Sequence, residues 1–112
     1  ATLLVTVVST ARPGQIIIDG GSKTFSSDRL TGSTEDTFGH LVEAPLAVFH
    51  KMNEEHGYVD VTQCDRTFDI GERLRIIPNH ICVAVNLHER IHGIRNEVVE
   101  EVWEVAGRGK LQ

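Results

Sequence analysis

Short apolar segments separated by turn residues recur along the whole chain of 112 residues, and this pattern limits the possible folds more than any other feature. The segments are rich in Ile and Val, and several of them alternate apolar with polar residues, as strands do. The segments expected to be strands are 3–8, 16–18, 58–61, 73–77, 82–87, 91–95 and 98–105. Many short strands with frequent turns predict an all-β fold, either an antiparallel β-barrel or a distorted sandwich, with few or no helices.

Turn residues indicate how these strands are joined. Pro13 followed by Gly14 is typical of a type II turn, because glycine can adopt a positive φ, and this turn would join the first two strands. A turn at Asn96 and Glu97 would make a hairpin of the last two. Residues 26–39 are rich in Ser, Thr, Asp and Gly and are predicted to form a long loop. Residues 45–52 fit either a strand or a short helix.

Composition excludes several classes of protein. A hydrophobic content of 40% and a charged content of 24% are typical of a folded domain. No apolar run approaches the roughly 20 residues of a membrane span. The net charge is -5 and the Lys and Arg residues are scattered, which argues against a nucleic-acid partner.

Cysteine content and the first residues bear on the setting of the chain. Cys64 and Cys82 are too few for a disulfide scaffold, and no secretion signal is present, so we expect reduced thiols and a cytoplasmic location. A strand begins almost at Ala1, without a Met. We therefore expect residues 1–112 to be one domain cut from a longer protein, with the missing part N-terminal.

The run from Pro78 to Cys82 carries the clearest chemistry. His80 and Cys82 follow the expected strand 73–77 directly. If the strand continued, the two side chains would point the same way, roughly 6–7 Å apart, and could hold one ion. Imidazole and thiolate together suit zinc, and two protein ligands would leave positions open for water or substrate. The alternative is a histidine and a cysteine that are simply packed in a sheet, with no metal.

Three further residues are candidates for the wall of such a site. His56, in a predicted turn, would either line the site or orient a ligand, or else be an ordinary surface histidine. Asn79 and Asn86 flank the predicted ligands, and in an extended chain Asn86 would share a face with Cys82. A purely structural amide is the alternative for Asn86.

Other polar residues fit a functional role less well. His88 and His92 could complete a zinc site, but an extended chain would carry them roughly 20 Å and more from His80. Lys23 follows two glycines, but no phosphate-loop spacing is present, and an ordinary polar loop residue is the simpler interpretation.

Several segments, taken in order, resemble the C-terminal domain of the D-serine dehydratase and D-threonine aldolase family. The segments are Ile18-Asp19-Gly20-Gly21-Ser22-Lys23, Ser26-Ser27-Asp28, Glu54-Glu55-His56-Gly57, Gly71-Glu72-Arg73, Pro78-Asn79-His80-Ile81-Cys82, Trp103 and Arg108-Gly109. The resemblance implies a fold-type III pyridoxal phosphate enzyme, whose N-terminal barrel carries the cofactor and its Schiff-base lysine outside this chain. It also implies that the β-rich C-terminal domain supplies a metal through His80 and Cys82.

The second ligand distinguishes two reactions within this resemblance. Cysteine there is characteristic of zinc-dependent dehydratases, and aspartate of aldolases with a harder ion such as manganese or magnesium. Cys82 therefore favours a dehydratase that converts D-serine, or a related 3-hydroxy D-amino acid, to a keto acid and ammonia; for D-serine the keto acid is pyruvate. Zinc would act as a Lewis acid on the substrate hydroxyl, and pyridoxal phosphate as the electron sink.

The resemblance also implies a homodimer and a small amino-acid substrate, with the fragment alone inactive. Two alternatives stay open. One is an aldolase on the same scaffold, and the other is a non-catalytic β-barrel module for binding or dimerisation.

Overall fold

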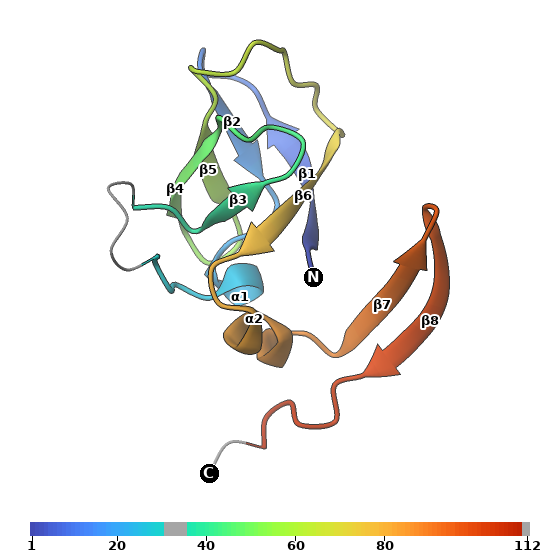
Figure 1. Cartoon of the computed structure of the whole chain (residues 1–112). Helices are drawn as coiled ribbons and strands as arrows, with labels where there is room; N and C mark the ends of the chain where they lie inside the picture. Colours follow the sequence, from blue (N-terminus) through green and yellow to red (C-terminus); the bar gives the residue numbers. More distant parts are fainter. Residues whose placement is uncertain (31–35, 111–112) are drawn as a thin grey trace.

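Six antiparallel strands form one sheet in the order β3-β6-β1-β2-β5-β4 (Figure 1). The computed structural model of the chain describes residues 1–30 and 36–110. The six strands are β1 (Leu3–Ser9), β2 (Gln15–Ile18), β3 (Gly39–Leu41), β4 (Val48–Met52), β5 (Gly57–Asp60) and β6 (Arg73–Pro78). The outer strands β3 and β4 approach each other, and the N–H of Phe38 donates to the carbonyl of Phe49 at 2.9 Å. The sheet therefore curls into a nearly closed barrel, which confirms the predicted all-β class.

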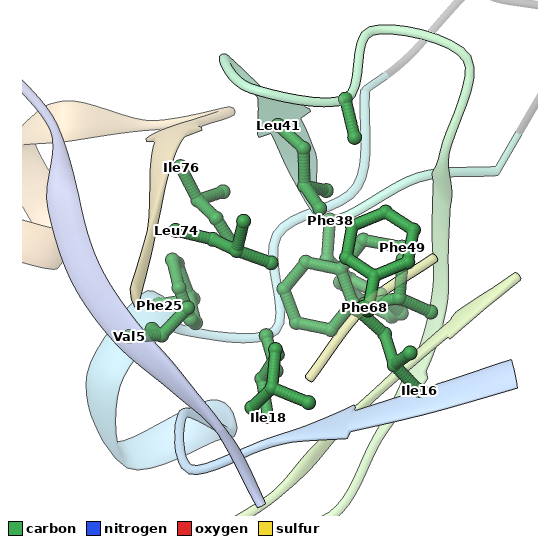
Figure 2. Close-up of a cluster of buried hydrophobic side chains, with 13 residues drawn as sticks. Val5, Ile16, Ile18, Phe25, Phe38, Leu41, Phe49, Phe68, Leu74 and Ile76 are labelled. Carbon is green, nitrogen blue, oxygen red and sulfur yellow. The ribbon is translucent and has the colours of Figure 1, made fainter. Parts of the chain in front are cut away.

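Alternating side chains fill the inside of this barrel. β6 shows the period of two clearly, with Leu74 and Ile76 fully buried and Arg73, Arg75 and Ile77 exposed. Figure 2 shows the same inward set from the other strands, joined by three phenylalanines from outside them. The core comprises Val5, Val7, Ile16, Ile18, Phe25, Phe38, Leu41, Ala44, Phe49, Val59, Phe68, Leu74 and Ile76.

One end of the barrel is covered by two short helices that pack together (Figure 1). The single turn α1 (Ser22–Phe25) inserts Phe25 into the core, where its ring meets Phe49 edge to face with centroids 5.3 Å apart. α2 (Ile81–Leu87) follows β6 directly and buries Ala84. The Nε2 of His88, just after α2, lies 3.1 Å from the carbonyl of Thr24 in α1 and ties the two helices together.

The helix α2 corrects the expectation that residues 82–87 would be extended. Its sequence, Ile-Cys-Val-Ala-Val-Asn-Leu, is rich in residues that favour strands. However, β6 has partners only as far as Pro78, which pairs with Gly39, and the chain then leaves the sheet. Packing of α2 against α1, with Ala84 buried, overrides the local preference, as tertiary context often does.

The predicted turns are largely where the sequence placed them. Gly14 has φ +73° between β1 and β2, which form the predicted hairpin. Residues 45–52 resolve into the strand β4 rather than a helix. Part of the expected loop 26–39, residues 31–35, lies outside the described residues, and β3 begins at Gly39.

A second, two-stranded sheet projects from the barrel (Figure 1). It consists of β7 (Arg90–Arg95) and β8 (Val98–Glu104), joined by Asn96 and Glu97 at φ 48° and 64°, the tight hairpin expected there. Its extension gives a radius of gyration of 14.4 Å, larger than the roughly 13 Å of a compact chain of this length. Trp103, in β8, lies outside the core and is 50% exposed.

Candidate metal centre

The end of β6 places His80 at the edge of the barrel. Asn79 and His80 continue the chain beyond the last sheet pairing, and His80 is the extended residue that precedes α2, with φ −132° and ψ 95°. Cys82 lies in the first turn of α2 and is exposed. The two residues do not alternate along a strand as predicted. Their α-carbons are nevertheless no more than about 7 Å apart, because they are only two positions apart in the chain.

The loop that follows α1 lies against His80. The Nδ1 of His80 is 2.8 Å from Oδ2 of Asp28, and both side chains are about half exposed. The side-chain amide of Asn79 donates to the carbonyl of Asp28 at 3.1 Å and to that of Thr37 at 2.5 Å. Asn79, predicted as a residue near the site, therefore holds two points of the loop against the end of β6.

A hollow of about 670 Å³ opens beside these contacts. Its lining residues are Ser27, Asp28, Arg29, Leu30, Asn79 and His80. It is a shallow, open surface that could hold one face of a small polar molecule, with His80 in its wall. A second hollow, of about 480 Å³, lies over the outer face of β2 and β5, and none of the predicted site residues lines it.

The remaining predicted site residues are in different positions. His56 lies in the turn between β4 and β5, where its N–H donates to Oδ1 of Asn53 at 2.6 Å, and no hydrogen bond in the described chain connects it to His80. Asn86 is partly buried in α2 and shares a face with Cys82, because the two are four positions apart in a helix. The shared face was predicted, although from strand alternation.

Both thiols are free, and their environments differ. Cys64 packs against the core, and burial raises the pKa of its thiol, with the nearby Asp60 and Asp65 acting in the same direction against Arg66. Cys82 is exposed. Cys82 is therefore the thiol that is accessible to an ion or reagent.

The donors at this site suit a borderline-soft metal held by two protein ligands. In the described part of the chain, no three His, Cys, Asp or Glu side chains gather closely enough to hold an ion. A closed four-ligand site is thus not built from residues 1–30 and 36–110. An imidazole and a thiol two positions apart in the chain are donors of the kind that zinc accepts, and two protein ligands would leave coordination positions open, as in catalytic sites.

The family model described as "putative serine dehydratase domain" matches residues 1–94, which end within β7. The chain belongs to this family.

Two relatives of this family member differ greatly in length. D-threonine aldolase of an Arthrobacter species is 33% identical over 107 residues, which are 96% of this chain but 26% of the relative. An uncharacterized protein of Mycobacterium tuberculosis is 36% identical over 113 residues, which are 97% of this chain and 84% of the relative. The chain therefore spans about a quarter of the aldolase and most of the mycobacterial protein.

Solved structures share the fold. D-threonine aldolase from Filomicrobium marinum matches with a TM-score of 0.82 at 24% identity, over 99% of this chain and 29% of that one. D-threo-3-hydroxyaspartate dehydratase from a Delftia species matches with a TM-score of 0.75 at 27% identity, over 92% and 31%. Structures of that dehydratase include an alanine variant of a histidine, and a metal-free alanine variant of a cysteine two positions further along.

The two described helices, α1 and α2, are both far too short to cross a membrane.

Proposed function

We propose that this chain is the metal-binding domain of a lyase that acts on 3-hydroxy D-amino acids, with His80 and Cys82 as the protein ligands. The observation that carries the proposal is the exposed pair itself: the imidazole of His80, which lines an open hollow, and the free, exposed thiol of Cys82 two positions further along the chain. The histidine and cysteine varied in D-threo-3-hydroxyaspartate dehydratase have the same spacing, and the cysteine variant has been solved in a metal-free form. Lyases on hydroxylated D-amino acids also recur among the named relatives.

Within this proposal, a zinc-dependent dehydratase with D-serine as substrate is the first candidate. A thiolate ligand selects zinc over manganese or magnesium. The pairing of histidine with cysteine also matches the dehydratase variants in kind and spacing. An aldolase is the second candidate, because the Arthrobacter relative, at 33% identity over nearly the whole chain, is an aldolase.

The residues of this chain have defined tasks in either reaction. A bound zinc would supply Lewis-acid chemistry at the substrate hydroxyl, and pyridoxal phosphate, held by the rest of the enzyme, an electron sink. His80 and Cys82 would hold the ion, with His80 in the wall of the hollow. Asn79 keeps the loop of Asp28 against His80, so that one wall of the hollow is already ordered before substrate binds.

The hairpin of β7 and β8 supports a place for this domain within a larger protein. Residues directly opposite each other share a face, so Ile94 and Val99 lie on one face and Ile91 and Trp103 on the other. Both faces thus carry exposed apolar side chains, and an isolated hairpin is only marginally stable in water. We assign the cover of this hairpin to the larger remainder of the lyase, since the aldolase relative is about four times as long.

The cytoplasmic location and the homodimer belong to the same proposal, and so does the inactivity of residues 1–112 alone. The cofactor-bearing barrel would be the N-terminal partner in the same polypeptide, and the substrate a small amino acid.

The metal content of the full-length lyase, of which residues 1–112 are proposed to be a domain, tests the proposal. We expect about one zinc per chain after gel filtration without chelator, lost in Cys82→Ala and retained in the matched variant Cys64→Ala. D-serine should then yield pyruvate. Glycine plus an aldehyde from a 3-hydroxy D-amino acid would move the assignment to the aldolase. Absence of metal in wild type after zinc is added would refute the metal-binding function.

A further inference from the structure

We infer that Asp28 is a positioning residue for the metal ligand His80: its carboxylate holds the proton on Nδ1 and so leaves the Nε2 lone pair free for the ion. The inference rests on the proposed function, because it concerns how His80 is prepared to bind. Sequence motifs gave Asp28 no role, and it reaches His80 only through the fold, from 52 residues away.

Hydrogen-bonding chemistry determines the direction of this contact. Oδ2 of Asp28 lies 2.8 Å from Nδ1 of His80. An ionised carboxylate can only accept, so the proton of the bond is on Nδ1. In the neutral ring the other nitrogen, Nε2, then carries the lone pair that a metal needs. Metal-binding histidines almost always donate their second ring N–H to a carboxylate, a carbonyl or water in this way.

Hydrogen bonds to the backbone N–H and carbonyl of Asp28 hold its carboxylate in place. The N–H of Asp28 donates to Oγ of Ser26 at 3.2 Å, and the carbonyl of Asp28 accepts from the Asn79 amide at 3.1 Å. Ser26 itself is fixed at the end of α1 with φ +68°, its N–H bonded to the carbonyl of Ser22. An exposed pair of side chains usually gains little because ordering them is costly. Here the backbone contacts order Asp28 before the pair forms.

The neighbouring cation does not compete with His80 for the carboxylate of Asp28. Arg29 is the next residue and the nearest cation in sequence, but its guanidinium pairs with Asp36 at 2.7 Å. Asp36 is therefore a matched control: a carboxylate on the other side of the same loop that pairs elsewhere. Asn79→Ala is a second probe, because it removes the support of Asp28 while both Asp28 and His80 remain.

Nitrogen NMR of the histidine rings in the metal-free chain, at a pH where imidazoles are neutral, tests the inference without any metal. We expect His80 in the wild type and in Asp36→Asn to carry its proton on Nδ1. Asp28→Ala and Asn79→Ala should shift the ring toward a mixture of the two tautomers. A wild-type ring protonated on Nε2, or a ring unchanged in Asp28→Ala, would overturn the inference.

Zinc titration by calorimetry then tests the consequence for binding. Loss of a carboxylate that orients a ligand typically weakens metal affinity about tenfold or more, and we expect this for Asp28→Ala but not for Asp36→Asn. Equal zinc affinity of wild type and Asp28→Ala would overturn the inference and leave the His80–Cys82 site intact. If the wild type binds no zinc, the proposed function fails, and the tautomer measurement still decides the role of Asp28.

Discussion

At the scale of single residues, the two cysteines show how burial separates similar side chains. Cys64 packs against the core, and burial raises the pKa of its thiol, so less of the reactive thiolate is present near neutral pH. Cys82 is exposed in the first turn of α2. A thiol reagent therefore reaches Cys82 more easily than Cys64, and the raised pKa of Cys64 lowers its reactivity further.

Alkylation should consequently modify Cys82 first. We expect iodoacetamide at neutral pH to label Cys82 at least several-fold faster than Cys64, measured by mass spectrometry of peptides over time. Added zinc should slow the labelling of Cys82 and leave Cys64 unchanged, because only Cys82 would become a ligand. Equal slowing at both cysteines would indicate a general effect of zinc on the chain instead.

Residues with distinctive chemistry could be found from the sequence, and their supports could not. His80 and Cys82 stand out because nitrogen and sulfur donors two residues apart are few in this chain. Asp28 is one of many acidic loop residues, and only the fold brings it to His80. The Ser-Ser-Asp run at the start of the predicted loop is the one local signal, since serine readily fixes a following N–H.

At the scale of elements, α1 is seated by a close approach of backbones. The N–H groups of Ser22 and Lys23 donate to the carbonyls of Asn53 and Glu54, in the turn between β4 and β5. A Cβ on Gly21 would collide with the carbonyl oxygen of Asn53 and meet that of Glu54 at 2.7 Å. Only glycine leaves room for this contact, which positions Phe25 in the core and the loop that leads to Asp28.

Gly21→Ala should therefore destabilise the whole barrel end. We expect a loss of about 2–4 kcal/mol in the free energy of unfolding, measured with urea, because backbone rather than a flexible side chain must move. Gly107→Ala is the control: its added Cβ meets nothing within 4 Å, and its effect should stay within about 0.5 kcal/mol. Similar losses in both variants would contradict the steric explanation.

A carboxylate just after β3 is bonded to the middle of β6. Burial acts to raise the pKa of Glu43, but hydrogen bonds from the side chain and backbone N–H of Arg75, together with its charge, outweigh it and hold that pKa below its usual value. A carboxyl whose pKa is lower in the folded state stabilises the fold above its unfolded pKa and loses this contribution as the pH falls.

Glu43→Gln should thus cost stability in a pH-dependent way. We expect the variant to lose about 1 kcal/mol at neutral pH, since the bonds from Arg75 weaken. The difference from wild type should shrink as the pH falls below about 4.3, the ordinary value for glutamate, where the wild-type carboxyl also becomes protonated. Urea unfolding at several pH values checks this, and a difference that is constant with pH would exclude the ionised carboxylate as its source.

Strands could be predicted from the sequence more reliably than the helix that matters for the site. Alternation is clear in β6 because each face has a fixed environment along the strand, and the turn at Asn96 and Glu97 indicated the last hairpin. Residues 81–87 have the composition of a strand, and nothing local indicates that β6 loses its neighbours at Pro78. The predicted strand geometry of His80 and Cys82 was wrong for this reason.

At the scale of the whole molecule, the chain consists of a barrel with its own core and a hairpin without one (Figure 1). Ile94 is 64% exposed and Val99, directly opposite it, 49%. The hairpin is closed at its base by the N–H of Val105, which donates to the carbonyl of Glu89 at 2.9 Å. It is therefore the part of the described chain whose stability depends most on a neighbour.

Charged substitutions on the face of the hairpin that carries Ile94 and Val99 should affect the stability of residues 1–112 and of the full-length lyase differently. In residues 1–112, the double variant Ile94→Lys and Val99→Lys should change the free energy of barrel unfolding by no more than about 0.5 kcal/mol, because both side chains already face water. In the full-length lyase, where we propose that the rest of the enzyme covers this face, the same two substitutions should lower Tm by several degrees, measured by calorimetry.

Leu46→Lys provides the control for that comparison. Leu46 is 62% exposed in the connection between β3 and β4, away from the hairpin, and its substitution should have little effect in either form. A double variant as stable as wild type in the longer protein would show that the hairpin stays exposed there. Buried apolar contacts supply most of the energy of association. The double variant would replace such contacts with two charges buried without partners, which is why we expect a lower Tm in the longer protein.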